Sequence, residues 1–392
     1  MYNETMYQLG SAPSAIRELF AYGMQRKAEI GEENVFDFSI GNPSVPAPDS
    51  VAQAIRELAA VPPAELHAYS AAQGLESARD AIAKNLNRRF ATSYTADNLY
   101  LTMGAAACLS ACFTALTDPG DEIIVIAPYF PEYRVWIESA GGVCVEVPAR
   151  EDNFQIDLAA LKAAITERTK AVVINTPNNP VGTVYTRETL EGLAAVLTDA
   201  EEEQGHDIYL ISDEPYRELT YGVEVPWVPA LYNNTLICYS WSKSLSLPGD
   251  RIGYVLVPDE VNNAHEVYLA VCGAGRSLGY VCAPVFFQRV IERCVDEPTN
   301  VEAYALNREI LTHALDELGY EYISPDGAFY LWIKALEADA QAFSDKAKEH
   351  ELLLVPSDSF GVGGWVRAGY CIDKSTIERS IPAFAALKAD YA

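Results

Sequence analysis

The segment "CYSWSKSLSLPGDRIGYVLV", residues 238–257, places polar residues between two apolar runs. The first run ends in Ser240, Ser242 and Lys243, and the second begins directly after Arg251. Short apolar runs bounded by turn residues are typical of buried strands. Because lysine and arginine normally face water, their positions at the ends of two such strands indicate a site for a charged ligand.

The rest of the chain places this segment in an α/β protein. Apolar runs that predict strands alternate with helical patterns: strands at 122–128, 171–177, 207–215, 235–240 and 251–257, and helices at 106–116, 158–165 and 188–203. This alternation predicts a mostly parallel central sheet flanked by helices. From about residue 300 the pattern changes to a long amphipathic helix, shorter strands and a final helix after Asp373, which indicates a smaller α+β domain.

We therefore expect three segments in the domain organisation. They are an N-terminal arm with part of the small domain (1–48), a large domain (49–295) and a C-terminal small domain (296–392).

Composition narrows the functional classes. The 392 residues are 49% hydrophobic and carry a formal net charge of −27, which argues against a nucleic-acid partner. No apolar run approaches the roughly 20 residues that span a bilayer, and the N-terminus lacks the basic and apolar regions of a secretory signal. The eight cysteines show no metal-ligand spacing, so we expect no metal site and buried thiols in a cytoplasmic protein.

Polar residues follow several of the predicted strands. Asn179 follows the strand at 171–177, Asp213 lies near the end of the strand at 207–215 with Tyr216 directly after it, and Lys243 follows the strand at 235–240. In open α/β sheets ligands bind at the carboxyl ends of the strands. A lysine amine condenses with an aldehyde to give a Schiff base, and a carboxylate keeps a pyridine nitrogen protonated. This set predicts an aromatic cofactor held covalently by Lys243, with Asp213 on its ring nitrogen and Tyr216 and Asn179 near its ring oxygen.

A second group of residues suits a phosphate. The segment "YLTMGAAACLSA", which starts at residue 100, predicts a short strand, then a turn of small residues at Gly104, Ala105 and Ala106, and then a helix whose N-terminus offers backbone N–H groups. Hydroxyls from Ser240 and Ser242 and the guanidinium of Arg251 supply further donors. The cofactor is therefore expected to be phosphorylated.

The motifs "NTPNNPVG", "SDEPY" and "SWSKSLSLPGDRIGY", in this order, resemble the fold-type I aminotransferases of class I/II, which depend on pyridoxal 5′-phosphate. The likeness extends from "FSIGNPSVPAP" near the start to "GGWVRAGYC" near the end. The resemblance implies transfer of the amino group of an L-amino acid to a 2-oxo acid by a ping-pong mechanism, with Lys243 as Schiff-base residue and proton carrier.

The resemblance also implies roles for residues whose own context is ambiguous. Phe130 would stack on the cofactor ring, and Tyr69 would reach the phosphate in a partner subunit, which implies a homodimer with shared active sites. Arg367 would bind the substrate α-carboxylate, and Gly41 would let the backbone approach that carboxylate.

Several points stay open at this stage. The turn Gly104–Ala106 lacks the hydroxyl often found there, and Arg276 and Tyr280 are assigned either to the phosphate or to the substrate pocket. A second arginine for a side-chain carboxylate is not placed, with Arg17, Arg134 and Arg276 as candidates, so the amino donor is not identified. PLP-dependent β-elimination and cyclopropane formation remain alternatives, because they begin with the same Cα deprotonation. A non-catalytic module is disfavoured, since no helix-turn-helix segment or basic surplus accompanies the motifs.

Overall fold

The computed structural model describes residues 2–12 and 14–392. The chain divides into two compact units. The large unit is built from Val45–Val301 with Asp326–Ala328, and the small unit from Met1–Ser44, Glu302–Pro325 and Phe329–Ala392. The expected domain limits at residues 48 and 295 are not tested by this division and remain a prediction.

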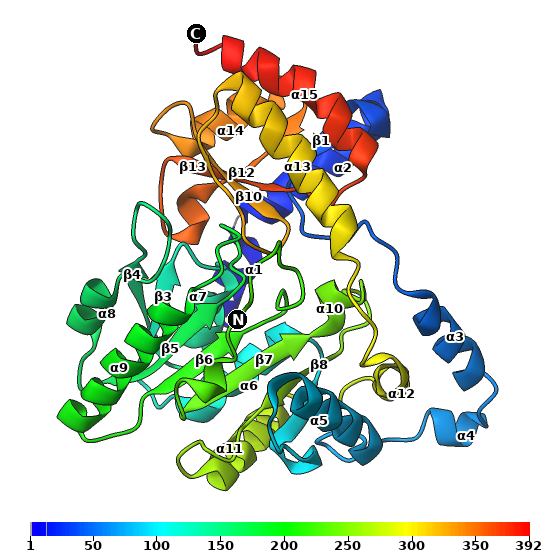
Figure 1. Ribbon diagram of the computed structural model, residues 1–392, viewed down its shortest axis with the longest axis vertical. Coiled ribbons are helices and arrows are strands. Elements are labelled where there is room, and N and C mark those ends of the chain that lie inside the picture. The colour runs from blue at the N-terminus through cyan, green and yellow to red at the C-terminus, as the bar shows by residue number, and fades with distance from the viewer. Residues whose placement is uncertain (1, 13) are drawn as a thin grey trace. The chain divides into compact units, whose positions relative to one another are not determined.

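A seven-stranded sheet forms the centre of the large unit (Figure 1). Its strands, in spatial order, are β2 (Leu99–Thr102), β8 (Gly253–Leu256), β7 (Thr235–Ser240), β6 (Tyr209–Asp213), β5 (Thr169–Asn175), β3 (Glu122–Ala127) and β4 (Val143–Pro148). Neighbouring strands are parallel except at β8, which is antiparallel to both β2 and β7. The predicted mostly parallel sheet is confirmed.

Helices cover this sheet through two apolar clusters. One cluster packs residues of β3, β5 and β6 against α8 (Leu158–Ala164) and α9 (Arg187–Gln204). The other packs β2, β7 and β8 against α3 (Asp49–Leu58), α5 (Glu76–Phe90) and α12 (Val285–Cys294). The remaining α-helices of this unit are α4 (Pro63–Leu66), α6 (Ala105–Leu116), α7 (Glu132–Ser139), α10 (Trp241–Ser244) and α11 (Ala264–Ser277).

Local sequence sets where these helices begin and end. The hydroxyl of Thr186 accepts from the backbone N–H of Thr189 at the start of α9, and Gly205 ends that helix with φ of 75°. Asp157 caps α8 in the same way by accepting from Ala159 and Ala160. Thr186 and Asp157 are thus polar residues directly before apolar-periodic segments, an arrangement that marks the start of a helix.

The small unit is α+β, as the sequence predicts. An antiparallel sheet has the order β12 (Val355–Pro356), β13 (Trp365–Gly369), β10 (Tyr330–Lys334) and β9 (Tyr322–Ile323), and β1 (Phe36–Asp37) pairs with β11 (Leu352–Leu353). Its helices are α1 (Glu4–Ser11), α2 (Ala15–Ile30), α13 (Val301–Leu318), α14 (Ala340–Lys348) and α15 (Lys374–Ala389).

One strand of the large sheet has no counterpart among the predicted strands. Val143–Pro148 forms β4 at the edge of the sheet, where only Val147 of the strand is buried. Because an edge strand needs no continuous apolar run, the segment "VCVEVP" gives a weak strand signal. Among the described residues, no helix is long and apolar enough to cross a membrane.

Candidate functional site

Lys243 lies directly beyond the carboxyl end of a buried strand. All six residues of β7 are buried, and the strand passes without a loop into the single helical turn α10 that carries Lys243. The lysine is half-buried, and its Nζ lies 6.0 Å from the ring centroid of Tyr216. The structure therefore brings the predicted covalent residue and one predicted ring contact together.

Asp213 is the last residue of the neighbouring strand β6. It pairs in register with Asn175 of β5 and Cys238 of β7, so its side chain stands at the same sheet edge as Lys243. The Asp213 carboxylate is buried, and its Oδ2 accepts a hydrogen bond of 2.5 Å from the hydroxyl of Tyr133. Its Oδ1 is buried and has no hydrogen-bond partner among the described residues.

Burial sets the charge state of this carboxyl group. Burial raises the pKa of Asp213 to about 7, with Glu214 adding to the rise and the Tyr133 hydrogen bond opposing it. A buried carboxylate oxygen without a donor costs free energy, and a cationic N–H donor removes that cost. The side chain therefore fits a protonated ring nitrogen placed against Oδ1.

The loop after β5 presents Asn179 near these residues. The side-chain oxygen of Asn175 accepts from the backbone N–H of Asn179 at 2.7 Å, and the Asn175 amide donates to the backbone oxygen of Asp213 at 2.8 Å. Asn178 turns the loop by accepting from Val181. Asn175 thus ties the Asn179 loop to the strand end that carries Asp213.

The turn at Gly104–Ala106 and Arg251, both expected to bind a phosphate, also lie next to each other. Gly104 has φ of 81° and caps α6, which begins at Ala105. A Cβ at Gly104 would lie 2.9 Å from Nη2 of Arg251, and the positive φ favours glycine at this position. Arg251 is exposed, and its Nη1 donates to the backbone oxygen of Pro248 at 2.8 Å.

Two hydroxyls complete this corner of the large unit. Ser240, the last residue of β7, pairs with Gly253 of β8, and a Cβ at Gly253 would lie 3.0 Å from the Cα of Gly104. The Ser240 hydroxyl donates to Ser242 at 3.1 Å. Hydroxyls, a guanidinium and the N-terminus of the twelve-residue α6 form a donor set that suits a dianionic phosphate.

Two residues assigned by resemblance, Phe130 and Tyr69, also belong to the large unit. Phe130 is half-buried, with its ring 5.8 Å from that of Tyr133 and 6.0 Å from that of Trp136. Tyr69 is 93% exposed. Within the described chain Tyr69 therefore adds nothing to the interior of the site.

Gly41 and Arg367 belong to the small unit and lie close to each other there. The Arg367 guanidinium carbon is 4.5 Å from the ring centroid of Tyr330, and its Nη2 donates to the backbone oxygen of Ser39 at 2.6 Å. A Cβ at Gly41 would lie 1.9 Å from the Tyr330 hydroxyl oxygen. Tyr330 thus leaves room only for glycine at position 41.

Sequence reasoning missed Tyr133 and Tyr330. Tyr133 lies in the first turn of α7, three residues after Phe130, and this spacing is the only signal of a shared site. Tyr330 begins β10 in "AFYLWIK", where it looks like an ordinary strand residue. Only the tertiary structure reveals them, because Tyr133 contacts Asp213 and Tyr330 contacts Arg367, each far away in the sequence.

Comparison with known proteins identifies the family. Residues 33–384 match the family model for aminotransferase class I and II. The chain belongs to this family. The aminotransferase is 31% identical over 351 residues to the aspartate/prephenate aminotransferase of Thermus thermophilus, covering 88% of this chain and 89% of that one. It is likewise 31% identical over 352 residues to the aspartate aminotransferase of Thermotoga maritima, covering 88% and 89%.

Solved structures agree in fold. An amino transferase from Eubacterium rectale has 55% identity and a TM-score of 0.97, covering 100% of this chain and 99% of that one. The aspartate aminotransferase of Thermus thermophilus with maleate has 28% identity and a TM-score of 0.88, covering 99% and 100%. The aminotransferase is thus a fold-type I enzyme that transfers amino groups with pyridoxal phosphate.

Proposed function

We propose that Lys243, Asp213 and the cradle around Gly104 hold pyridoxal phosphate, and that Lys243 carries the proton during amino transfer. The observation that carries this assignment is the buried Oδ1 of Asp213, which has no partner among the described residues and lies at the sheet edge where β7 delivers Lys243. When bound, pyridoxal phosphate supplies an aldehyde for amine exchange and an electron-poor ring that eases removal of the substrate Cα proton.

Each residue of the large unit then has a defined task. Asp213 holds a proton on the ring nitrogen, and Tyr133 holds Asp213 in place through its hydroxyl. Tyr216 and Asn179 donate to the ring oxygen. The backbone N–H groups of Ala105 and Ala106, with Ser240, Ser242 and Arg251, bind the phosphate. Phe130 covers the ring face.

Lys243 Nζ is proposed to take the Cα proton of the substrate and to hold it during amino transfer. A lysine serves this purpose when its amine is partly neutral. Lys243 is half-buried, and its Nζ lies 6.0 Å from the ring centroid of Tyr216, which places the amine beside a proposed contact of the cofactor ring.

In the small unit, Arg367 is proposed to bind the α-carboxylate of the amino acid and of the 2-oxo acid. It is 2% exposed and its guanidinium lies against the rings of Tyr330 and Phe360, at 4.5 Å and 5.3 Å from their centroids. A planar guanidinium in such a slot binds a carboxylate in one orientation. Gly41 is proposed to let the substrate carboxylate approach the backbone.

We further propose a homodimer with shared active sites, in which Tyr69 reaches the partner's phosphate site. The support is that Tyr69 is 93% exposed in the single chain and that α1 buries none of its residues although it carries Met6 and Tyr7. Sedimentation should give twice the chain mass. Tyr69→Phe should weaken cofactor binding, and a monomer of full activity would contradict the assignment.

The cytoplasm is the proposed compartment. None of the eight cysteines, all within the described residues, forms a disulfide, which suits a reducing environment. Cell fractionation tests this, and recovery of the protein outside the cytoplasmic fraction would contradict it.

Reduction of the cofactor-loaded enzyme with borohydride, followed by peptide mapping, tests the central assignment. The reduced adduct should lie on Lys243, and an adduct on another lysine would refute it. Lys243→Ala should abolish turnover at an unchanged fold, whereas Lys170→Ala serves as a control, because Lys170 lies in β5 away from its carboxyl end.

Single-amino-acid half reactions then identify the donor. The loaded enzyme is mixed with one amino acid at a time, and loss of the visible absorption band marks a donor. Aspartate is tested first because relatives are named aspartate aminotransferases. Release of pyruvate and thiol from a cysteine conjugate, without amino transfer to 2-oxoglutarate, would instead reveal β-elimination.

A further inference from the structure

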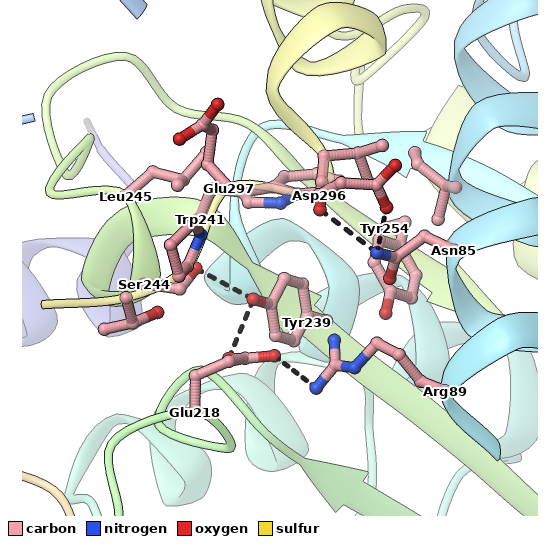
Figure 2. Close-up of a pocket in the computed structure, with 14 residues that line it drawn as sticks. Asn85, Arg89, Glu218, Tyr239, Trp241, Ser244, Leu245, Tyr254, Asp296 and Glu297 are labelled. Atoms are coloured by element: carbon pink, nitrogen blue, oxygen red, sulfur yellow. Dashed lines mark hydrogen bonds and ion pairs between the residues drawn. The ribbon is translucent and has the colours of Figure 1, made fainter. Parts of the chain in front are cut away.

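A chain of polar contacts lies on the wall of a cavity that is lined in part by Ser244, the residue after Lys243. The cavity has a volume of about 210 Å³ and lies within the large unit. Figure 2 shows the Tyr239 hydroxyl between the side chains of Ser244 and Glu218, with Arg89 beyond Glu218. The Tyr239 oxygen is 2.9 Å from Glu218 Oε2 and 2.8 Å from the Ser244 hydroxyl, and Arg89 Nη2 is 2.8 Å from Glu218 Oε1.

The proton positions in this chain follow from the chemistry of its members. Glu218 forms an ion pair with Arg89, and its Oε2 accepts the hydrogen bond from the Tyr239 hydroxyl. The single proton of Tyr239 therefore goes to Glu218. Ser244 in turn donates to the Tyr239 oxygen. Burial, with Glu218 beside the ring, raises the pKa of Tyr239 well above its usual value, so this donor stays protonated.

The polar contacts from Ser244 through Tyr239 to Glu218 connect two parts of the proposed active site. Ser244 follows Lys243 directly and is the last residue of α10, which has only four residues. A helix of one turn is not stable by its own hydrogen bonds. Glu218 lies in the turn that contains Tyr216, where the N–H of Leu219 donates to the Tyr216 backbone oxygen at 2.8 Å. The chain therefore connects the Lys243 turn to the Tyr216 turn.

The tyrosine at the centre of this connection is buried and packed against two other rings. Tyr239, Tyr254 and Trp241 are each at most 5% exposed, and the Tyr239 ring lies 5.1 Å from Tyr254 and 5.4 Å from Trp241. Hydrogen bonds of a buried hydroxyl such as that of Tyr239 are stronger than in water, and breaking one leaves a buried group without a partner.

We propose that Tyr239 is a positioning residue for Lys243, acting through Ser244 and fixed by the Glu218–Arg89 ion pair. The proposal rests on the role proposed above for Lys243. It assigns no contact between Tyr239 and the cofactor. Its effect is to hold α10 so that Lys243 Nζ keeps its place beside Tyr216.

Tyr239→Phe removes the hydroxyl and keeps the ring. The matched control is Tyr254→Phe, which removes a hydroxyl in the same cavity from a ring that stacks on Tyr239. Because small displacements of a reacting group cost much rate, we expect kcat of Tyr239→Phe to fall about tenfold while KM stays within about twofold. The pH midpoint of the visible absorption change of the loaded protein should shift, and the cofactor-free variant should bind pyridoxal phosphate more weakly by tryptophan fluorescence.

Three further variants test the order of the chain. Ser244→Ala should reproduce the Tyr239→Phe effects, and the double variant should be no worse than either alone, since both break one chain. Glu218→Gln keeps an oxygen that accepts from Tyr239, so it should retain the wild-type pH midpoint more closely than Glu218→Ala.

Two outcomes would overturn the proposal. One is that Tyr239→Phe behaves like Tyr254→Phe in kcat, pH midpoint and cofactor affinity, and the other is that the effects of Tyr239→Phe and Ser244→Ala simply add. Peptide mapping of the borohydride-reduced adduct distinguishes failure of the positioning role of Tyr239 from failure of the proposed role of Lys243. An adduct that remains on Lys243 in Tyr239→Phe shows that only the positioning role is in question.

Discussion

The carboxylate of Asp213 and the hydroxyl of Tyr133 form a buried hydrogen bond that engages Oδ2 and leaves Oδ1 without a partner among the described residues. The two residues are 80 positions apart in the sequence. Their contact fixes one side of the carboxylate and directs the other side toward a donor that the described chain does not supply.

The raised pKa of Asp213 makes the stability of the cofactor-free protein depend on pH. The folded pKa is about 7, above the ordinary value of 3.8. Between these values the folded state holds a proton that the unfolded state has released, so the free energy of unfolding falls as pH rises. Asp213→Asn has no carboxyl group to titrate, so its free energy of unfolding should not show this fall. The difference in the free energy of unfolding between this variant and wild type should therefore increase in favour of the variant by about 2–3 kcal/mol from pH 5 to pH 8.

Urea unfolding of the cofactor-free proteins at both pH values measures this effect. Asp97→Asn is the control for replacing an aspartate by asparagine, because its side chain is 96% exposed and the change removes no buried carboxyl group. A difference for Asp213→Asn that is equal at pH 5 and pH 8 would contradict the burial argument. The same variant should bind pyridoxal phosphate far more weakly than wild type.

Tyr133→Phe should weaken cofactor binding although Tyr133 is not among the residues proposed to contact the cofactor. Hydrogen bonds to charged groups contribute about 1.5–3 kcal/mol, so the dissociation constant of pyridoxal phosphate should rise about tenfold or more. Fluorescence titration of the cofactor-free protein provides the measurement. Tyr129→Phe is the control, since the hydroxyl of Tyr129 donates to Glu146 instead, and equal affinities of the two variants would refute the role of Tyr133.

Gly41→Ala should disturb the arginine site of the small unit. The added Cβ would lie 1.9 Å from the Tyr330 oxygen and must displace that side chain, which packs on Arg367. We expect a raised KM for the amino acid and a smaller rise when Tyr330→Phe is also present. Gly363→Ala is the control because a Cβ there meets no atom within 4 Å. An unchanged KM in Gly41→Ala would show that the site tolerates a side chain.

The turn after Asp213 depends on a buried ion pair between Arg217 and Glu214, whose side chains are 5% and 1% exposed. Arg217→Met leaves the Glu214 charge buried and should lower the free energy of unfolding by about 3–5 kcal/mol. Adding Glu214→Gln should restore part of this loss. Arg187→Met, in an exposed pair with Glu191, should change stability by less than about 1 kcal/mol. Denaturant unfolding distinguishes these cases.

Much of the site was predictable because its residues follow strands directly. Asp213 ends β6 and Lys243 lies in the turn after β7, and the carboxyl ends of parallel strands share one sheet edge. Order along the chain therefore implies proximity in space for these two residues. The strand at Val143–Pro148 was not predicted, because an exposed edge strand needs no continuous apolar run.

The sequence by itself determined the alternation of strands and helices, the small-residue turn at Gly104 and the chemistry at the strand ends, because local periodicity and capping encode them. Only the tertiary structure decided that Tyr133 donates to Asp213, that Tyr330 excludes a side chain at Gly41, and that Tyr239 joins Ser244 to Glu218. These contacts join residues from different elements. Side-chain packing in the folded core sets them, and no spacing along the chain records it.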